Sequence, residues 1–249
     1  MTLSELEREV RRLRVYAAVS TTLAVLALLA AQGHAQSKTT HFAEIDAERI
    51  NIIEADGRPA LVLANTERLP GPMLAGRELS KELSAGRLGS AGMIFIDAQG
   101  NEVGGLVYGA RVKSDGSFSA ESGFTFDQHN QDQVVGFEYE DNGSRRSYGV
   151  SVWDRPTKVS IAEMLDAARG AADREARHRR FAELLKQRGD TVGARRVFLG
   201  SQDRTAALRL ADVAGRERIR LYVDNANSPR MEFLDESGKV VYAIPPRTR

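Results

Sequence analysis

The sequence predicts a mainly β protein, built from antiparallel hairpins and meanders as a sandwich or a partly open barrel. We also expect one N-terminal transmembrane helix and a helical insertion at about residues 160–188. Three observations lead to this fold class: a turn pattern that recurs between apolar runs, an uncharged stretch near the N-terminus, and apolar stripes at helical spacing. The 249 residues, 42% apolar and 28% charged, have an ordinary globular composition.

These signals divide the chain into five segments. In order, they are a cytoplasmic amphipathic stub (1–14), a transmembrane signal-anchor (15–35), an N-terminal β section (36–158), a helical insertion (159–190) and a C-terminal β-meander (191–249).

The predicted anchor is an apolar run close to the N-terminus. Residues 15–31 contain no Asp, Glu, Lys or Arg, and no Gly or Pro. A helix of that length spans about 26 Å, and residues 32–35 extend it to the ~30 Å of a hydrocarbon core. Arginines at positions 8, 11, 12 and 14 precede the run, so the positive-inside rule leaves the N-terminus in the cytoplasm. We therefore expect the protein at the inner (cell) membrane, bound to the lipid bilayer through residues 15–35, with an extracytoplasmic C-terminal domain.

Two alternatives to a retained anchor stay open. Gly33 and Ala35 are small residues at the two positions that signal peptidase recognises before its cleavage site, and cleavage there would give a secreted soluble protein. The apolar run is also compatible with an ordinary buried helix. The stub argues for retention, because its apolar residues recur at spacings of three and four and form an amphipathic helix. They are Leu3, Leu6, Val10 and Leu13. This pattern is also compatible with a weak homodimer.

The β segments are predicted from one turn pattern, an acidic residue followed three positions later by glycine. It occurs at 54–57, 97–100, 140–143, 212–215 and 235–238, each time between apolar runs. The acidic residue suits the first position of a type I turn, and glycine suits a last position with positive φ. Such turns close hairpins, and the flanking runs give at least ten strands. Gly57, Gly100 and Gly143 are spaced 43 residues apart. This equal spacing is compatible with a repeated structural unit and with a chance spacing of turns in a β-meander.

Two stretches interrupt the strands. Residues 66–92 are rich in glycine and long for a connector, which is typical of a functional or mobile loop. Ser160 and Glu163 form a capping box ahead of an apolar stripe, and Asp173 can cap a second helix that ends at Gly189. The stripes predict a helical hairpin laid against the sheet.

The search for chemistry is mostly negative. The chain has no cysteine and no phosphate loop, zinc-binding helix or nucleophile elbow, so we expect no catalytic residue, no metal and no cofactor. The net charge of +1 nominates no partner, and export argues against nucleic acid. Residues 37–168 hold 13 basic and 20 acidic side chains, whereas residues 169–220 hold 14 and 7. This asymmetry is compatible with two sections that face each other, with a basic face turned toward anionic lipid headgroups or an envelope polymer, and with an ordinary solvated face.

One polar segment, residues 124–136, offers candidate ligand-binding residues. They are Phe124, Phe126, Asp127, His129 and Asp132. Aromatic rings beside amides and carboxylates can bind a sugar or a peptide backbone. Asp127 with Asp132 or Glu138 is alternatively an acid/base pair for glycoside hydrolysis. The segment also reads as a solvated hairpin loop.

Three segments, residues 42–51, 126–135 and 153–156, resemble an uncharacterised family of bacterial membrane-anchored, β-rich envelope proteins. The resemblance implies location and a β-rich ectodomain, and no activity. The sequence therefore favours a binding or scaffolding protein of the bacterial envelope, with an envelope polymer or a protein as partner. The alternatives are an envelope glycan or peptide hydrolase that uses carboxylates, and a secreted form.

Overall fold

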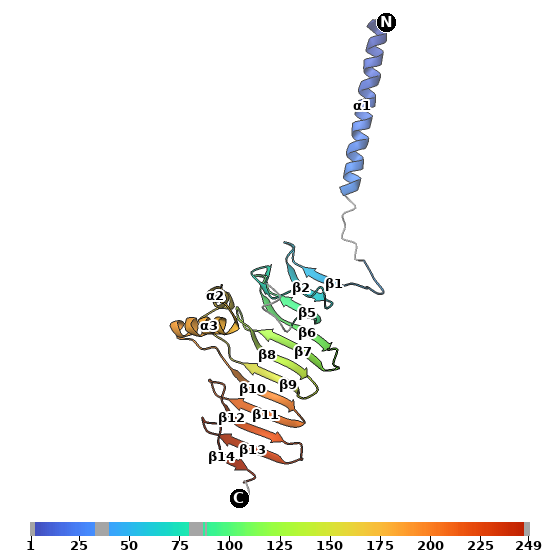
Figure 1. The fold of residues 1–249 in the computed structure, drawn as a ribbon. Helices are drawn as coiled ribbons and strands as arrows, with labels where there is room; N and C mark the ends of the chain where they lie inside the picture. Colours follow the sequence, from blue (N-terminus) through green and yellow to red (C-terminus); the bar gives the residue numbers. More distant parts are fainter. Residues whose placement is uncertain (1–2, 33–39, 80–86, 88, 247–249) are drawn as a thin grey trace. The chain divides into compact units, whose positions relative to one another are not determined.

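The computed structural model describes residues 3–32, 40–79, 87 and 89–246. The chain forms two compact units, Met1–Asp46 and Ala47–Arg249, and each is described by itself. The ribbon in Figure 1 shows the helix of the first unit and the strands of the second.

The first unit contains one long helix, α1 (Leu3–Gln32). Its hydroxyl side chains are satisfied inside the helix: Ser20, Thr21 and Thr22 each donate to the carbonyl four residues earlier, at 2.7 to 2.8 Å, a common arrangement for such residues within helices. Within the described part of the chain, no helix combines the length and the hydropathy needed to cross a bilayer. The helix is therefore confirmed, but the predicted transmembrane character of residues 15–35 gains no support, and residues 33–35 lie outside the described residues.

The second unit is dominated by one antiparallel sheet of twelve strands. In spatial order the strands are β1 (Arg49–Ile53), β2 (Pro59–Ala64), β5 (Ala91–Ile96), β6 (Glu102–Val112), β7 (Phe118–Asp127), β8 (Gln133–Asp141), β9 (Arg146–Trp153), β10 (Arg195–Gln202), β11 (Thr205–Ala211), β12 (Glu217–Val223), β13 (Pro229–Leu234) and β14 (Val240–Ile244). The apolar runs on either side of each of the five predicted turns pair as antiparallel strands, for example Ile50 with Leu63 and Leu210 with Ile219.

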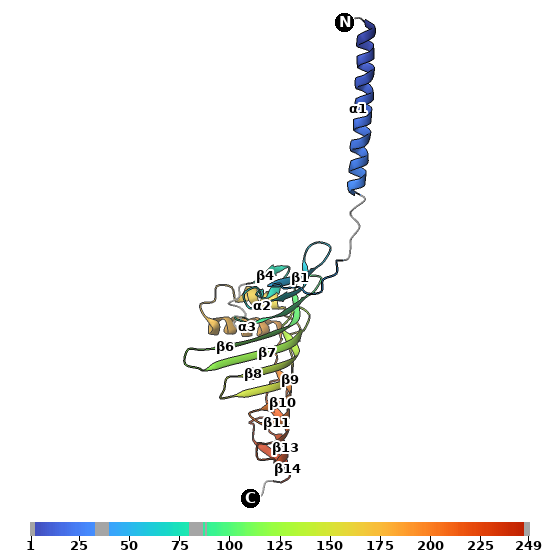
Figure 2. The same ribbon diagram turned by 90° about the vertical axis from the view of Figure 1, so that its right-hand side faces the viewer.

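The prediction of a sandwich or a partly open barrel is wrong. Almost every strand pairs with its neighbours in sequence, so the sheet grows in one direction and β1 and β14 remain separate edges. The only other sheet among the described residues is the small pair β3 (Met73–Leu74) and β4 (Arg77–Glu78). Figures 1 and 2 show the strands stacked as a single layer from β1 to β14.

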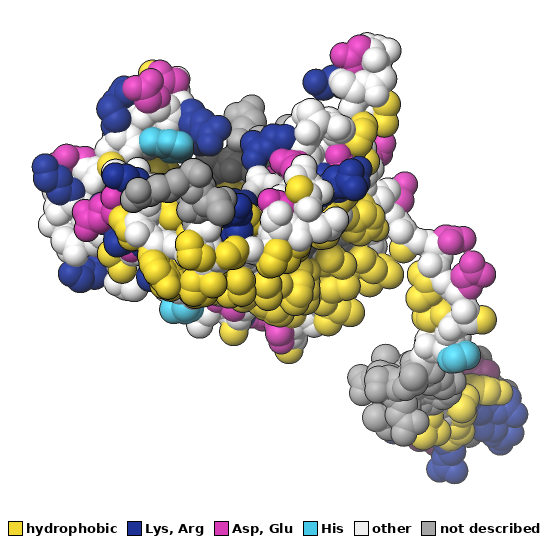
Figure 3. Space-filling view, turned by 90° about the horizontal axis from the view of Figure 1, so that it is seen from below, with side chains coloured by type: hydrophobic (Ala, Val, Ile, Leu, Met, Phe, Trp, Pro, Cys, Tyr) yellow, Lys and Arg dark blue, Asp and Glu magenta, His cyan; other side chains and the backbone are white. Residues whose placement is uncertain are grey.

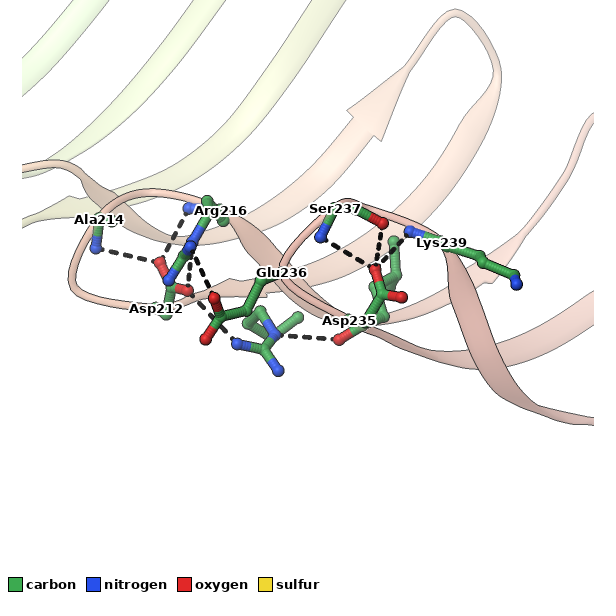
Figure 4. A network of polar contacts seen from close by, with 9 residues as sticks. Asp212, Ala214, Arg216, Asp235, Glu236, Ser237 and Lys239 are labelled. Atoms are coloured by element: carbon green, nitrogen blue, oxygen red, sulfur yellow. Dashed lines mark hydrogen bonds and ion pairs between the residues drawn. The ribbon is translucent and has the colours of Figure 1, made fainter.

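Four of the five predicted turns form as expected. The amide of each glycine at 57, 100, 215 and 238 donates to the carbonyl three residues earlier at 2.9 to 3.1 Å, and each glycine has φ between 77° and 86°. Figure 4 shows two of them side by side, with the Asp212 and Asp235 carboxylates accepting hydrogen bonds across their own turns. An Arg216–Glu236 ion pair of 3.2 Å joins the two turns.

The fifth turn is shifted by two residues from the prediction. β8 continues to Asp141, and Asn142 takes the first turn position, where its side-chain oxygen accepts from the amides of Ser144 and Arg145. Gly143 still adopts a positive φ of 80°. The acidic residue at position 140 is therefore a strand residue.

The helical insertion is confirmed as α2 (Ile161–Ala167) and α3 (Arg174–Arg188). The capping box of Ser160 and Glu163 is complete, the Asp173 carboxylate accepts from the Ala176 amide at 2.7 Å, and Gly189 ends α3 with φ 62°. The two helices share a small core, which consists of Val159, Met164, Leu185, Phe181 and Leu184. The sheet continues past this insertion, because β9 pairs directly with β10.

The largest buried core lies on one face of the N-terminal strands. Val62 and Ile94 are fully buried there, beneath the segment that carries β3 and β4, and Leu69 and Met73 supply the covering apolar contacts. The described part of the glycine-rich stretch is therefore a structural cover for β2 and β5.

Candidate functional site

The strand register gives the sheet one face that is almost wholly apolar. Residues paired directly across neighbouring strands point to the same face, so two rows of side chains can be followed across all twelve strands. The first row is Ile52, Leu61, Phe95, Gly104, Phe126, Val135, Val152, Val197, Leu210, Ile219, Phe233 and Tyr242. The second is Ile50, Leu63, Met93, Leu106, Phe124, Phe137, Val150, Leu199, Leu208, Leu221, Met231 and Ile244. We call these 24 positions the apolar face.

Nothing in the described residues buries the apolar face. Apart from Gly104, every one of its residues is half-buried or exposed, and Phe137 and Tyr242 are 61% and 60% exposed. The space-filling view in Figure 3 shows hydrophobic side chains gathered in a continuous patch over the strands. Scattered exposed apolar residues are ordinary, whereas a large contiguous patch marks an interaction surface.

The opposite face, which we call the back face, is polar where no segment covers it. The row between the two apolar rows reads Ser151, Phe198, Arg209, Arg220, Glu232 and Ala243 from β9 to β14. The guanidinium groups of Arg195 and Arg209 lie 5.3 and 5.9 Å from the Phe198 ring centre. Charged side chains therefore shield this face, and the two faces differ sharply in chemistry.

A second feature is a pocket of about 410 Å³ with both polar and apolar walls. It lies where the β7–β8 turn meets the segment that carries β3 and β4 and the first turns of α2. Its polar lining comes from Arg87, Asn101, Glu102, Asp127, Asn130, Gln131, Asp132 and Gln133, and its apolar lining from Pro72, Met73, Leu74, Leu79, Ile161 and Leu165. Arg87 and Glu102 form an ion pair whose side chains are 16% and 12% exposed.

Three hydrogen bonds hold the β7–β8 turn, which forms the polar wall of the pocket, in place. The β7–β8 turn is closed by the Gln131 amide, which donates to the Gln128 carbonyl at 2.8 Å, and Asn130 has φ 56°. The Gln131 side-chain amide donates to the Val159 carbonyl, and the Ile161 amide donates to the Asn130 carbonyl at 2.8 Å. The turn is thus fixed to the start of α2.

Asp127 is the electrostatically perturbed group of the pocket. Burial, with the nearby Glu102 and Asp132 carboxylates, raises the pKa of Asp127 to about 7, against the opposing pull of Arg87 and Arg155. Asp132 itself lies 3.6 Å from Arg155. A carboxyl group that exchanges its proton near neutral pH, inside a pocket, is a common property of functional sites.

Three buried polar atoms at this pocket have no hydrogen-bond partner among the described residues. They are Nη1 of Arg87, Oε2 of Glu102 and Oδ1 of Asp127. Buried polar groups in native proteins are nearly always paired, so a donor and two acceptors here are placed for groups that the described residues do not supply.

The structure separates the five residues that the sequence grouped into one site. Asp127 and Asp132 line the pocket. Phe124 and Phe126 belong to the apolar face, where their rings lie 6.2 and 6.3 Å from that of Phe95. The separation follows from β7 alternation and the register shift after Phe126, which put neighbouring side chains on opposite faces.

His129 lies exposed in the β7–β8 turn, with its ring Nε2 3.0 Å from the side-chain Nδ2 of Asn130. It is absent from the pocket lining. Sequence reasoning missed Arg87 and Glu102. Glu102 is the first residue of β6, directly after the predicted turn at 97–100, and a single acidic residue there does not indicate a site. Arg87 lies far from Asp127 in the sequence, and only the folded chain brings the two residues to the same pocket.

Within the described ranges, no three His, Asp or Glu side chains gather in a way that would hold a metal ion. No protein-family model, no curated protein and no solved structure matches this chain.

Proposed function

We propose that the protein is a binding module of the bacterial envelope, anchored to the membrane by its N-terminal segment, which takes a polar group of an envelope polymer into the pocket. The observation that carries this proposal is the convergence of Arg87, Glu102 and Asp127, each with a buried polar atom that lacks a partner among the described residues. A donor beside two acceptors suits the hydroxyl groups of a sugar or the amides of a peptide. The apolar lining from α2 and from the segment around β3 suits the carbon skeleton of such a ligand.

The membrane part of the proposal is supported by sequence alone. Residues 15–31 carry no Asp, Glu, Lys or Arg and follow four arginines, a pattern typical of a segment with its N-terminus in the cytoplasm. Membrane fractionation with protease accessibility and N-terminal sequencing tests it. A chain recovered from cytosol contradicts the anchor, and a chain that begins at about residue 36 supports the secreted alternative.

Binding is tested with soluble glycan and peptide fragments of bacterial cell wall, titrated by calorimetry against the full chain. Asp127→Asn keeps the size of the side chain and replaces one acceptor by a donor, so we expect at least tenfold weaker binding. Glu140→Gln is the matched control, because Glu140 is exposed on β8 and does not line the pocket. Equal affinity of all three proteins would contradict the pocket as the binding site.

One observation favours a second function, hydrolysis of the same polymers. A carboxyl group with a pKa of about 7 beside two further carboxyl groups, those of Glu102 and Asp132, has the properties of a general acid. Release of new reducing ends or amino groups from the fragments, lost in Asp127→Asn, would support the hydrolase. Tight binding without release supports the binding module.

A further inference from the structure

We propose that the apolar face is covered by the same face of a second copy of this chain. The inference concerns a surface distinct from the pocket and does not rest on the proposed function. It starts from 23 apolar side chains on one face, none of them buried.

The size of the apolar face matches what a stable dimer needs. Twelve strands at a spacing of ~4.8 Å extend ~58 Å, and two rows ~7 Å apart cover a width of ~14 Å. The face therefore measures ~800 Å² on each copy and ~1,600 Å² in a pair, which is the typical size of a specific interface with 20 to 30 residues per side.

The chemistry of the face favours a like partner. None of its 24 positions carries a charge, so pairing two copies buries no ionic group. The row beside it is more polar and carries Tyr108, Tyr139 and Tyr148 with Ser122 and Ser201. An apolar centre with a tyrosine-rich rim is the usual anatomy of a protein interface. A second sheet packed at ~10 Å would complete the sandwich that a single copy lacks.

The first unit offers separate support in the spacing of the apolar residues near the start of its helix. Leu3, Leu6, Val10 and Leu13 are 78%, 45%, 39% and 64% exposed on α1. Their alternating spacing is that of a two-helix seam. Association of two copies supplies a partner for both surfaces.

The absence of cysteine allows a direct test on the full chain in membranes. A spin label on Glu138→Cys sits on β8, the sixth strand of the twelve, and points to the back face. Pulsed dipolar spectroscopy should show one intermolecular distance on the order of 20–30 Å, the ~10 Å sheet spacing plus two label arms, with the modulation depth of two spins. No coupling, or the depth of three or more spins, would overturn the proposal.

Two further variants show whether the apolar face makes the contact. Phe137→Lys places a charge at the centre of the face, at a side chain that is 61% exposed in one copy, so the chain should fold with an unchanged circular dichroism spectrum and lose the coupling. Val213→Lys is the control, since Val213 is 72% exposed in a turn outside the face and should keep it. Coupling that survives Phe137→Lys overturns the proposal.

Lipid is the competing occupant of the apolar face. In that case a spin label on Phe137→Cys would collide with oxygen dissolved in the bilayer, and the Glu138→Cys label would show no coupling. That combination would also overturn the proposal.

Discussion

Arg220 and Glu232 lie directly opposite each other on β12 and β13, with Nη2 of Arg220 2.5 Å from Oε2 of Glu232. The Glu232 side chain is 1% exposed, whereas the Arg220 side chain is 33% exposed. Arg220 also lies 3.3 Å from Glu217, so one guanidinium serves two carboxylates. This ion pair across the strand pair helps to offset the cost of burying the Glu232 charge.

Arg220→Met should therefore destabilise the second unit. It removes the ion pair between Arg220 and the buried Glu232 carboxylate. We expect a loss of about 2 kcal/mol in the free energy of unfolding, less than for a fully buried pair because Arg220 is partly exposed. The double variant Arg220→Met/Glu232→Met removes both charges and should recover most of that loss. Urea unfolding measures both values. A single variant as stable as the parent would contradict the assignment.

The raised pKa of Asp127 predicts a distinct dependence of stability on pH. Between about pH 4 and pH 7 the unfolded chain has lost the Asp127 proton and the folded chain still holds it. The free energy of unfolding therefore falls as pH rises through this range, by up to about 1.4 kcal/mol per pH unit. Above pH 7 both states are ionised and this contribution is constant.

Asp127→Asn should abolish that slope. It stays neutral at all these pH values, so we expect its advantage over the parent chain to begin near pH 4, to grow up to pH 7 and to reach about 1–2 kcal/mol at pH 8, a value reduced for the opening of the pocket to solvent. Carboxyl groups with lowered pKa values, such as Asp212 and Asp235, lose their stabilising effect only below about pH 4, so they do not interfere. Equal slopes for both proteins in urea titrations would refute the assignment.

The hairpin turns predict a difference between alanine and asparagine at Gly238. This glycine has φ 80°, and an added Cβ would meet no atom within 4 Å, so only backbone strain opposes substitution. Gly238→Ala should cost about 1–2 kcal/mol, the usual penalty for a left-handed L-residue. Gly238→Asn should cost less, as Asn227 already adopts φ 62° at the same position of the β12–β13 turn. Thermal unfolding that ranks the two variants in the opposite order would contradict this account.

Local features of the fold were predictable because they depend on short-range geometry. The turn at Asp235–Gly238 and the cap at Ser160 are fixed by hydrogen bonds within four residues. The alternation along each strand likewise identifies which residues share a face.

The arrangement of the whole sheet was not predictable on the same basis. Alternating strands predict a buried apolar face, and in one chain that burial requires a sandwich or a barrel. The structure places Phe137 and Leu199 on an uncovered face instead. The covering layer that the pattern demands is absent from the described residues, so no local signal distinguishes a single layer from half of a sandwich. The pocket was not predictable for a related reason, because Arg87 and Asp127 are far apart in the sequence and line the same pocket only in the folded chain.

The capping box at α2 connects local stability to the pocket. The Ser160 hydroxyl accepts from the Glu163 amide at 3.3 Å, and the Glu163 carboxylate accepts from the Ser160 amide at 2.9 Å. Ile161 and Leu165, in the first turns after this cap, line the pocket. Ser160→Ala should therefore lower the free energy of unfolding by about 1 kcal/mol, whereas Ser160→Asp, which retains an acceptor, should lower it by less. Hydrogen exchange should show faster exchange of the Glu163 and Met164 amides in Ser160→Ala, because the first turn of α2 opens when its cap is lost. Unchanged exchange at these amides would mean that contacts with the β7–β8 turn, and not the cap, hold this wall of the pocket.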